Sequence, residues 1–164
     1  MKYQDRTFES AAIERMESCD VFDYDAFVVT IKTQCRNYGK ISQQFCLRYP
    51  KIRLPDLGWG VSSEPQVLPD GKFVIFTCLW PDQEGGQPYP PVKVYGCTAS
   101  AIRLAAQAGL PEIALPLIGG SEKYARVPAM GQAIHDALAL LERRRLDIDV
   151  VIALGEDHHF RRSL

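Results

Sequence analysis

The chain has 164 residues, of which 46% are hydrophobic and 24% are charged, and this composition is typical of one globular domain. Its 19 Lys and Arg residues nearly balance its 20 Asp and Glu residues, and the net charge of -1 excludes a global positive field for nucleic acid, though not a local basic patch. No apolar run approaches the ~20 residues that a membrane span requires, and the polar N-terminal segment lacks the apolar stretch of a signal peptide.

The five cysteines are odd in number, and none are spaced as C-x-x-C. This pattern is typical of reduced thiols in a cytoplasmic protein rather than of a disulfide framework. No spacing among them suits a structural zinc, so we expect no metal, and nothing in the sequence calls for a cofactor.

The first third of the chain favours a helix, a strand and a second helix. Residues 7–18 suit a short helix with Met16 among its apolar positions. Residues 25–31, DAFVVTI, form an apolar run rich in β-branched residues, as expected for a strand buried on both faces. Residues 34–40 have turn chemistry, and residues 41–50 favour a helix that a proline ends.

A hairpin and a long loop are expected in the middle of the chain. Two apolar runs within residues 66–78 flank Pro69-Asp70-Gly71, which is a hairpin signal. Residues 79–91 contain four prolines and two glycines, and we expect them to form a surface loop without regular structure.

The second half alternates helices with strands. Residues 95–108 favour a helix that Gly109 stops, and residues 112–118 favour an apolar strand. Residues 127–143 show a helical apolar stripe, and residues 147–154 favour a last strand. The alternation predicts an α/β fold, in which a mixed sheet has helices on both faces and ligands bind outside the carboxyl ends of the strands.

A glycine-rich turn, Gly119-Gly120-Ser121, lies directly between a strand pattern and a helix pattern. Glycines there let bare backbone amides approach an anion, and the helix dipole adds partial positive charge. The turn therefore predicts a phosphate loop, and the alternative is a tight strand-to-helix turn without a ligand.

A second polar turn follows the first buried strand and contains Arg36, Asn37, Gly39 and Lys40. Either Arg36 or Lys40 can pair with a phosphate, and the alternative is a solvated charged loop. Two backbone-rich loops at the same sheet edge would suit a diphosphate.

Residues 31–50, IKTQCRNYGKISQQFCLRYP, resemble the first phosphate loop and following helix of a macro domain. The resemblance is to the branch of terminal ADP-ribose glycohydrolases and DNA ADP-ribose glycohydrolase antitoxins, and rests on Cys35, Arg36, Ile41 and Phe45, with Gly39 one place off. The hairpin also resembles that branch, as does AAQAGLPEIALPLIGGSE, which is similar to its second phosphate loop. The resemblance implies one macro-like domain over residues 1–164, with three α/β/α layers, a mixed central sheet and a core over about 20–155.

The resemblance also implies binding of ADP-ribose or a related NAD-derived nucleotide. An Asp ahead of the first strand receives the adenine amino group in the family, and Asp20 matches it best, although a plain turn aspartate is equally in keeping with the pattern. Tyr124, just past the glycine turn, can stack on adenine or ribose, as can Trp59 or Trp80, although aromatic residues are more often core. The expected ligand-binding residues are Asp20, Arg36, Asn37, Gly39, Lys40, Ile118, Gly119, Gly120, Ser121 and Tyr124.

The chain departs from the catalytic pattern of the family. The lysine that follows the hairpin strand in the hydrolytic branch is absent from Cys78-Leu79-Trp80. The Asp after the second glycine loop is replaced in Ser121-Glu122-Lys123, where Glu122 can act as a base or simply favour the helix dipole. The Asn at the end of the first strand is missing too, so the known chemistry cannot be carried over.

Three histidines complete the candidates. His158 and His159 follow the last strand beside Asp157, and suit acid/base or metal chemistry or, more simply, a solvated tail. His135 is expected to be a surface or boundary residue of the last helix.

Three functions therefore stay open. The chain binds ADP-ribose without turnover, or it is a hydrolase of ADP-ribosylated protein or nucleic acid that uses Glu122 with His158 or His159, or it is an interaction scaffold with an inactive pocket. Tyr38 and Lys40, where the family has small residues, favour the last by narrowing the cleft. We expect the loop over residues 79–91 to border that cleft.

Overall fold

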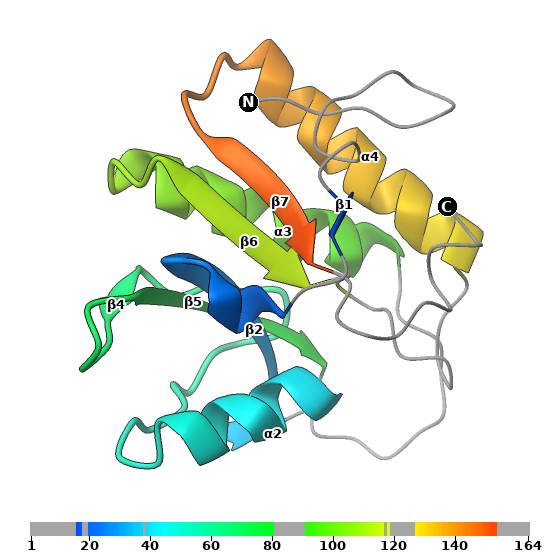
Figure 1. Cartoon of the computed structure of the whole chain (residues 1–164). Helices are drawn as coiled ribbons and strands as arrows, with labels where there is room; N and C mark the ends of the chain where they lie inside the picture. Colours follow the sequence, from blue (N-terminus) through cyan, green and yellow to red (C-terminus); the bar gives the residue numbers. More distant parts are fainter. Residues whose placement is uncertain are drawn as a thin grey trace.

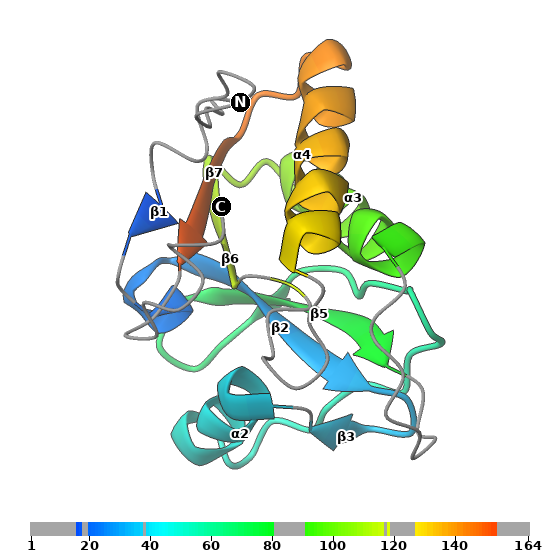
Figure 2. The ribbon, with the colours of Figure 1, turned by 90° about the vertical axis from the view of Figure 1, so that its right-hand side faces the viewer.

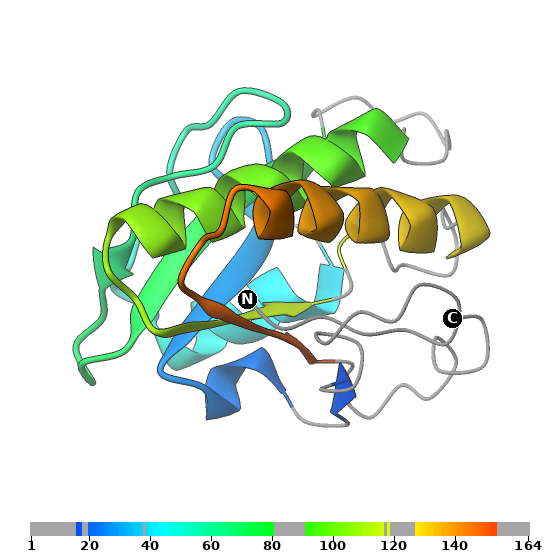
Figure 3. The ribbon, with the colours of Figure 1, turned by 90° about the horizontal axis from the view of Figure 1, so that it is seen from above.

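The computed structural model describes residues 16–17, 20–37, 39–80, 91–116, 118 and 127–153. A twisted central sheet is covered by helix α2 (Gly39–Arg48) on one face and by α3 (Pro91–Gln107) and α4 (Val127–Arg143) on the other (Figure 1). Seen from above, α3 and α4 run side by side (Figure 3). The three-layer α/β/α arrangement confirms the fold class expected from the sequence. None of the described helices is long and apolar enough to cross a membrane.

The described residues form a seven-stranded sheet in the order β1-β7-β6-β2-β5-β4, and β3 pairs with the end of β2. The strands from β1 to β5 in this order run parallel to one another, whereas β4 and β3 run antiparallel to their partners. A short 3-10 helix, η1 (Val21–Asp23), lies between β1 and β2. The strands are β1 (Met16–Glu17), β2 (Ala26–Lys32), β3 (Arg36–Asn37), β4 (Gln66–Val67), β5 (Phe73–Trp80), β6 (Glu112–Pro116) and β7 (Asp149–Ala153).

The carboxyl ends of the parallel strands lie along one edge of the sheet, which we call the carboxyl edge. Glu17 of β1 and Pro116 of β6 both pair with Ala153, the last residue of β7. β2 pairs with β6 at Phe27, but near its own carboxyl end, at Lys32, it pairs with β3 instead. The chain therefore turns back at the end of β2, directly at the carboxyl edge.

Alternate residues of the central strands fill two cores, one on each face of the sheet. Val28 of β2 faces α3 and α4 and shares a buried cluster with Leu138 of α4. Phe27 of β2 and Phe76 of β5 face the other way and pack with Phe45 of α2. Both faces of β2 are therefore buried, as its continuous apolar run predicts.

Most expected elements are confirmed, and the last helix matches residue for residue. The hairpin between β4 and β5 turns at Asp70 and Gly71, where the Gly71 amide donates to the Leu68 carbonyl at 2.9 Å. Gly109 has a φ of +76°, and the Leu110 amide donates to the Ala105 carbonyl at 3.1 Å. This is the glycine-capped helix end that the sequence predicts.

The expected helix over residues 7–18 is wrong at its end. Met16 and Glu17 form β1 and pair in parallel with Ile152 and Ala153 of β7. Pairing with a distant strand outweighs the local helical pattern there, and the residues before Met16 lie outside the described ones.

Two expected irregular segments are also partly ordered. Leu79 and Trp80 extend β5, because Trp80 pairs with Lys32 of β2, and Pro91 begins α3. Arg36 and Asn37, expected in a turn, form β3 because β2 folds back on them. Residues 81–90 lie outside the described ones.

Candidate functional site

Segments that the sequence singles out begin at the carboxyl edge. The turn over residues 33–35 follows β2 there, and Ile118 comes two residues after the end of β6. Figure 2 shows β3 and α2 beside each other, both below β2. Ligands of open α/β sheets bind outside this edge, so we expect a ligand site here.

The turn after β2 is strained. Gln34 and Cys35 have φ values of 62° and 57°, which lie in the left-handed region. This conformation costs a residue with a side chain about 1–2 kcal/mol. Arg36 then enters β3 opposite Lys32, and its side chain is exposed. Backbone strain of this kind gathers at ligand-binding turns.

Helix α2 begins at the carboxyl edge, two residues after β3. Gly39 has a φ of +75°, and a Cβ there would meet no atom within 4 Å, so conformation rather than crowding favours glycine. The first turn contains no acidic residue, and the Lys40 side chain is exposed. The backbone amides of the first turn, the positive end of the helix dipole and a lysine therefore favour an anion at this helix start.

Next to the second glycine turn, the structure describes only Ile118, directly before Gly119. Ile118 is 1% exposed and belongs to the core beneath α3 and α4, so it anchors the chain where β6 ends. The remaining candidates stay predictions because they lie outside the described residues, as do the side chain of Asn37 and the whole of Tyr38. These candidates are Gly119, Gly120, Ser121, Glu122, Tyr124, Asp157, His158 and His159.

Asp20 lies on the path from the carboxyl edge back to the start of β2. It follows β1 by three residues and is partly exposed, and its amide donates to Asp23 Oδ2 at 3.2 Å. Asp25, in contrast, directly precedes β2, and its carbonyl accepts the Phe73 amide at 2.8 Å. Of these aspartates, Asp20 is therefore the one whose place in the chain suits a ligand at the carboxyl edge.

Trp59 and Lys93 form a contact at the end of β5, and Lys93 is a residue that the sequence analysis did not single out. Trp59 is 38% exposed and donates from Nε1 to the Leu79 carbonyl at 2.7 Å. Lys93 Nζ, from the first turns of α3, lies 4.5 Å from the centre of the Trp59 ring. This cation–π pair lies where β5 ends, but no local pattern links two residues from such different parts of the chain.

Tyr49 and Asp70 form a second contact that has no sequence signal. Tyr49, just after α2, donates its hydroxyl to Asp70 Oδ2 at 2.6 Å. Burial and then this hydrogen bond raise the pKa of Tyr49 to about 12, and the same bond lowers the pKa of Asp70 below its ordinary value of 3.8. The pair ties the end of α2 to the hairpin turn.

Replacing Tyr49 by phenylalanine is expected to lower the free energy of unfolding by about 1 kcal/mol at neutral pH, because one hydrogen bond to a carboxylate is lost. The lowered pKa of Asp70 stabilises the fold above pH 3.8, and this contribution is lost as pH falls through the lowered value. The raised pKa of Tyr49 stabilises below pH 10.0, and this contribution is lost as pH rises towards about 12.

Urea unfolding of both proteins at about pH 3, 7 and 11 measures the difference, which should narrow at both extremes. Tyr95→Phe on α3 is the control, for which no such narrowing is expected. A Tyr49→Phe difference that stays constant across this range would contradict the assignment.

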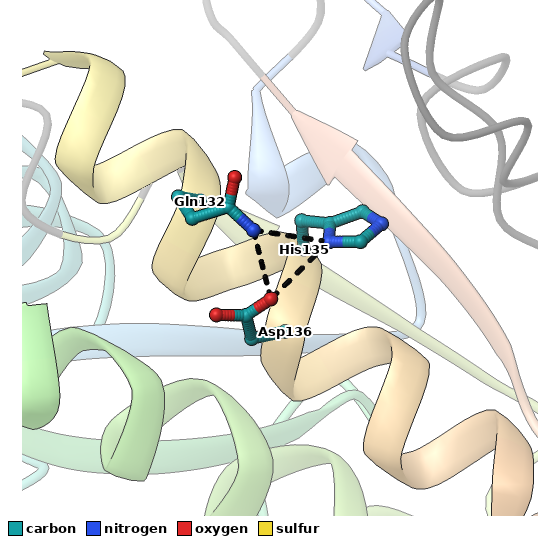
Figure 4. Close-up of polar contacts among 3 residues, drawn as sticks. All are labelled: Gln132, His135 and Asp136. Carbon is teal, nitrogen blue, oxygen red and sulfur yellow. Dashed lines mark hydrogen bonds and ion pairs between the residues drawn. The ribbon is translucent and has the colours of Figure 1, made fainter.

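His135 is a boundary residue of α4, as expected. Its ring Nδ1 lies 3.4 Å from Asp136 Oδ1, which also accepts a hydrogen bond from Gln132 Nε2 at 2.8 Å (Figure 4). The His135 side chain is 14% exposed and that of Asp136 is 55% exposed. Within the described part of the chain, no group of three or more His, Cys, Asp or Glu side chains could hold a metal ion.

The described cysteines are free thiols, as the sequence predicts. Cys78 and Cys97 are buried, and burial raises the pKa of Cys97 to about 11, which makes it a poor nucleophile. Cys35 is exposed in the strained turn, but no described geometry gives it a base, so no role is assigned to it.

Comparison with solved structures identifies the fold. No protein-family model and no curated protein matches the sequence. The macrodomain of Mycobacterium tuberculosis DarG is similar in structure, with a TM-score of 0.66 at 19% identity over 85% of this chain and 96% of that chain. The Trypanosoma brucei macrodomain in complex with ADP-ribose has a TM-score of 0.66 at 19% identity, over 90% of this chain and 66% of that chain.

A second structure of the Trypanosoma brucei macrodomain, in complex with ADP, has a TM-score of 0.71 at 16% identity and matches 99% of this chain and 72% of that chain. These likenesses agree with the strand order and with the helix layers described above. The chain has the macro-domain fold.

Proposed function

We propose that this protein binds ADP-ribose, or a related NAD-derived nucleotide, at the carboxyl edge of its sheet. The observation that supports this most is the start of α2, where the left-handed Gly39 and the exposed Lys40 follow the strained turn after β2. The backbone amides at a helix start suit one phosphate, and the glycine turn after Ile118 would hold the other.

The structural relatives support the same ligand. Macrodomains of the same fold have been solved with ADP-ribose and with ADP. In this proposal Asp20 accepts the adenine amino group, Arg36 and Lys40 face the diphosphate, and Tyr124 packs against a ring of the ligand. Each of these roles suits the chemistry of the side chain.

Calorimetric titration tests the proposal. ADP-ribose is expected to bind with a dissociation constant on the order of micromolar, and AMP and NAD serve as comparison ligands. Gly120→Glu should weaken ADP-ribose binding by about 100-fold or more, because a carboxylate would stand where the proposal places a phosphate. Gln66→Glu adds the same charge on the exposed strand β4 and should leave the affinity unchanged.

Failure to bind all three compounds would contradict the proposal and leave the scaffold interpretation. Binding that Gly120→Glu and Gln66→Glu leave equally intact would show that the ligand occupies another place.

A further inference from the structure

The helix η1, which follows Asp20, depends on contacts from elsewhere in the chain. It has three residues, and so short a helix does not form by itself because nucleation fixes several residues for few hydrogen bonds. Val21 and Phe22 are buried, and the Phe22 ring packs edge-on against Phe27 at 5.1 Å. Arg48 of α2 places its guanidinium 4.5 Å from the centre of the Phe22 ring.

The side chain of Lys72 contacts the backbone of η1. Lys72 Nζ donates a hydrogen bond to the Phe22 carbonyl, across 50 residues of sequence. A charge-assisted bond of this kind is stronger than one between neutral groups. Lys72 is partly buried, so solvent screens the bond less than it would at an open surface.

The hairpin turn between β4 and β5 in turn holds Lys72. Its amide donates to Asp70 Oδ1 at 3.1 Å, and its carbonyl accepts the Leu68 amide at 2.7 Å. The other carboxylate oxygen of Asp70 accepts the Tyr49 hydroxyl. The ammonium therefore extends from a braced turn, which limits how far the Phe22 carbonyl can move.

Asp20 is part of the same small turn as Phe22. The Asp20 carbonyl accepts the Asp23 amide at 3.1 Å, and the Asp20 amide donates to the Asp23 carboxylate. A shift of the Phe22 carbonyl therefore moves the backbone from which the Asp20 side chain extends. A hydrogen bond from Asp20 to a ligand would weaken steeply as the carboxylate left the preferred distance and angle.

We infer that Lys72 is a positioning residue for adenine recognition, which holds η1 so that Asp20 meets the 6-amino group of the base. The inference rests on the proposed function. It adds Lys72, which directly precedes β5 and so lies at the end of that strand that is farther from the carboxyl edge. Its distinguishing consequence is that Lys72 affects the preference for the amino group, not the affinity for the rest of the ligand.

The test compares two ligands on the full chain by calorimetry. One is ADP-ribose, and the other is its purine analogue, which carries hydrogen in place of the 6-amino group. The wild-type protein should prefer ADP-ribose by about tenfold, the effect expected for one hydrogen bond to a carboxylate. Lys72→Met should remove this preference while the affinity for the purine analogue stays the same.

Further variants sharpen the result. Lys72→Arg keeps a cationic donor and should restore the preference. Asp20→Ala should remove the preference by itself, and adding Lys72→Met to it should change nothing more. Lys51→Met, on an exposed lysine beyond α2, is the matched control and should behave as wild type. Should Lys72→Met fail to fold, Lys72→Gln keeps the stem and a neutral donor and should show a reduced preference.

The outcomes separate the two proposals. If the wild-type protein binds neither compound, the proposed function fails and this inference fails with it. If it binds both and Lys72→Met weakens both equally, the proposed function stands and Lys72 merely supports the fold, which overturns the inference. Equal wild-type affinity for the two compounds also overturns it, because Asp20 then does not read the amino group.

Discussion

Replacing Phe45 by alanine is expected to lower the free energy of unfolding by about 3–5 kcal/mol, the range measured for large aromatic side chains removed from well-packed cores. Phe45 is fully buried between α2 and the sheet. Its ring lies 5.2 Å from that of Phe76, 6.4 Å from that of Phe27 and 5.0 Å from that of Tyr49. Its loss therefore leaves a cavity that several rigid rings cannot close.

Urea unfolding followed by circular dichroism measures this loss, with the midpoint and slope fitted together. Leu47→Ala on the same helix is the matched control, because Leu47 is 81% exposed and its truncation should change stability by no more than about 0.5 kcal/mol. Similar losses for the two variants would mean that α2 does not pack as described. Because α2 begins at Gly39, a loosened helix should also weaken the proposed nucleotide binding.

The second large effect is expected on the other face of the sheet. Leu138→Ala should cost about 2–5 kcal/mol, because Leu138 is fully buried between α4 and the sheet. The helix directly follows the segment that contains the second glycine turn, so its docking also sets where that segment ends. Loss of this buried contact should therefore lower both the stability of the fold and the affinity for the proposed nucleotide.

The same unfolding measurement applies, with Glu142→Ala as its control. Glu142 lies one turn further along α4 and is exposed, so its replacement should alter stability by no more than about 0.5 kcal/mol. A Leu138→Ala protein as stable as this control would place α4 away from the sheet.

The elements that follow from local periodicity are those that sequence predicts best. The apolar stripe over residues 127–143 gives α4 its bounds, since one side of the helix packs on the sheet. The continuous apolar run of β2 predicts burial on both faces, and Gly109 predicts the end of α3. In each case, one short stretch contains all the information.

Local sequence patterns do not predict the elements that depend on partners far away in the chain. β1 has two residues and forms because β7 offers backbone partners 136 residues later, as the pairing of Met16 with Ile152 shows. The end of β5 looks like a loop because of the prolines that follow it, but pairing with β2 makes it a strand. Propensity is a weak guide where tertiary pairing decides the conformation.

The features of the candidate site also fall into those that have a local sequence signal and those that depend on distant partners. Gly39 is predicted because a polar glycine turn after a buried strand is a local pattern, and the left-handed conformation agrees with it. The left-handed Gln34 and Cys35 have no such signal, since neither residue type favours that region. The contact of Lys72 with Phe22 joins two turns that only the folded sheet brings together.

The two outer strands of the sheet bear on how the protein behaves at high concentration. β1 and β4 lie at opposite ends of the strand order, and each has only two residues in the described part of the chain. Beyond β4, the Val61 carbonyl accepts the Cys78 amide and the Gly60 amide donates to the Cys78 carbonyl, so a neighbouring segment occupies that side of β5. Long rows of unpaired backbone groups invite strands of other molecules, and short or covered edges oppose this. The described edges of this sheet are therefore poor templates for aggregation.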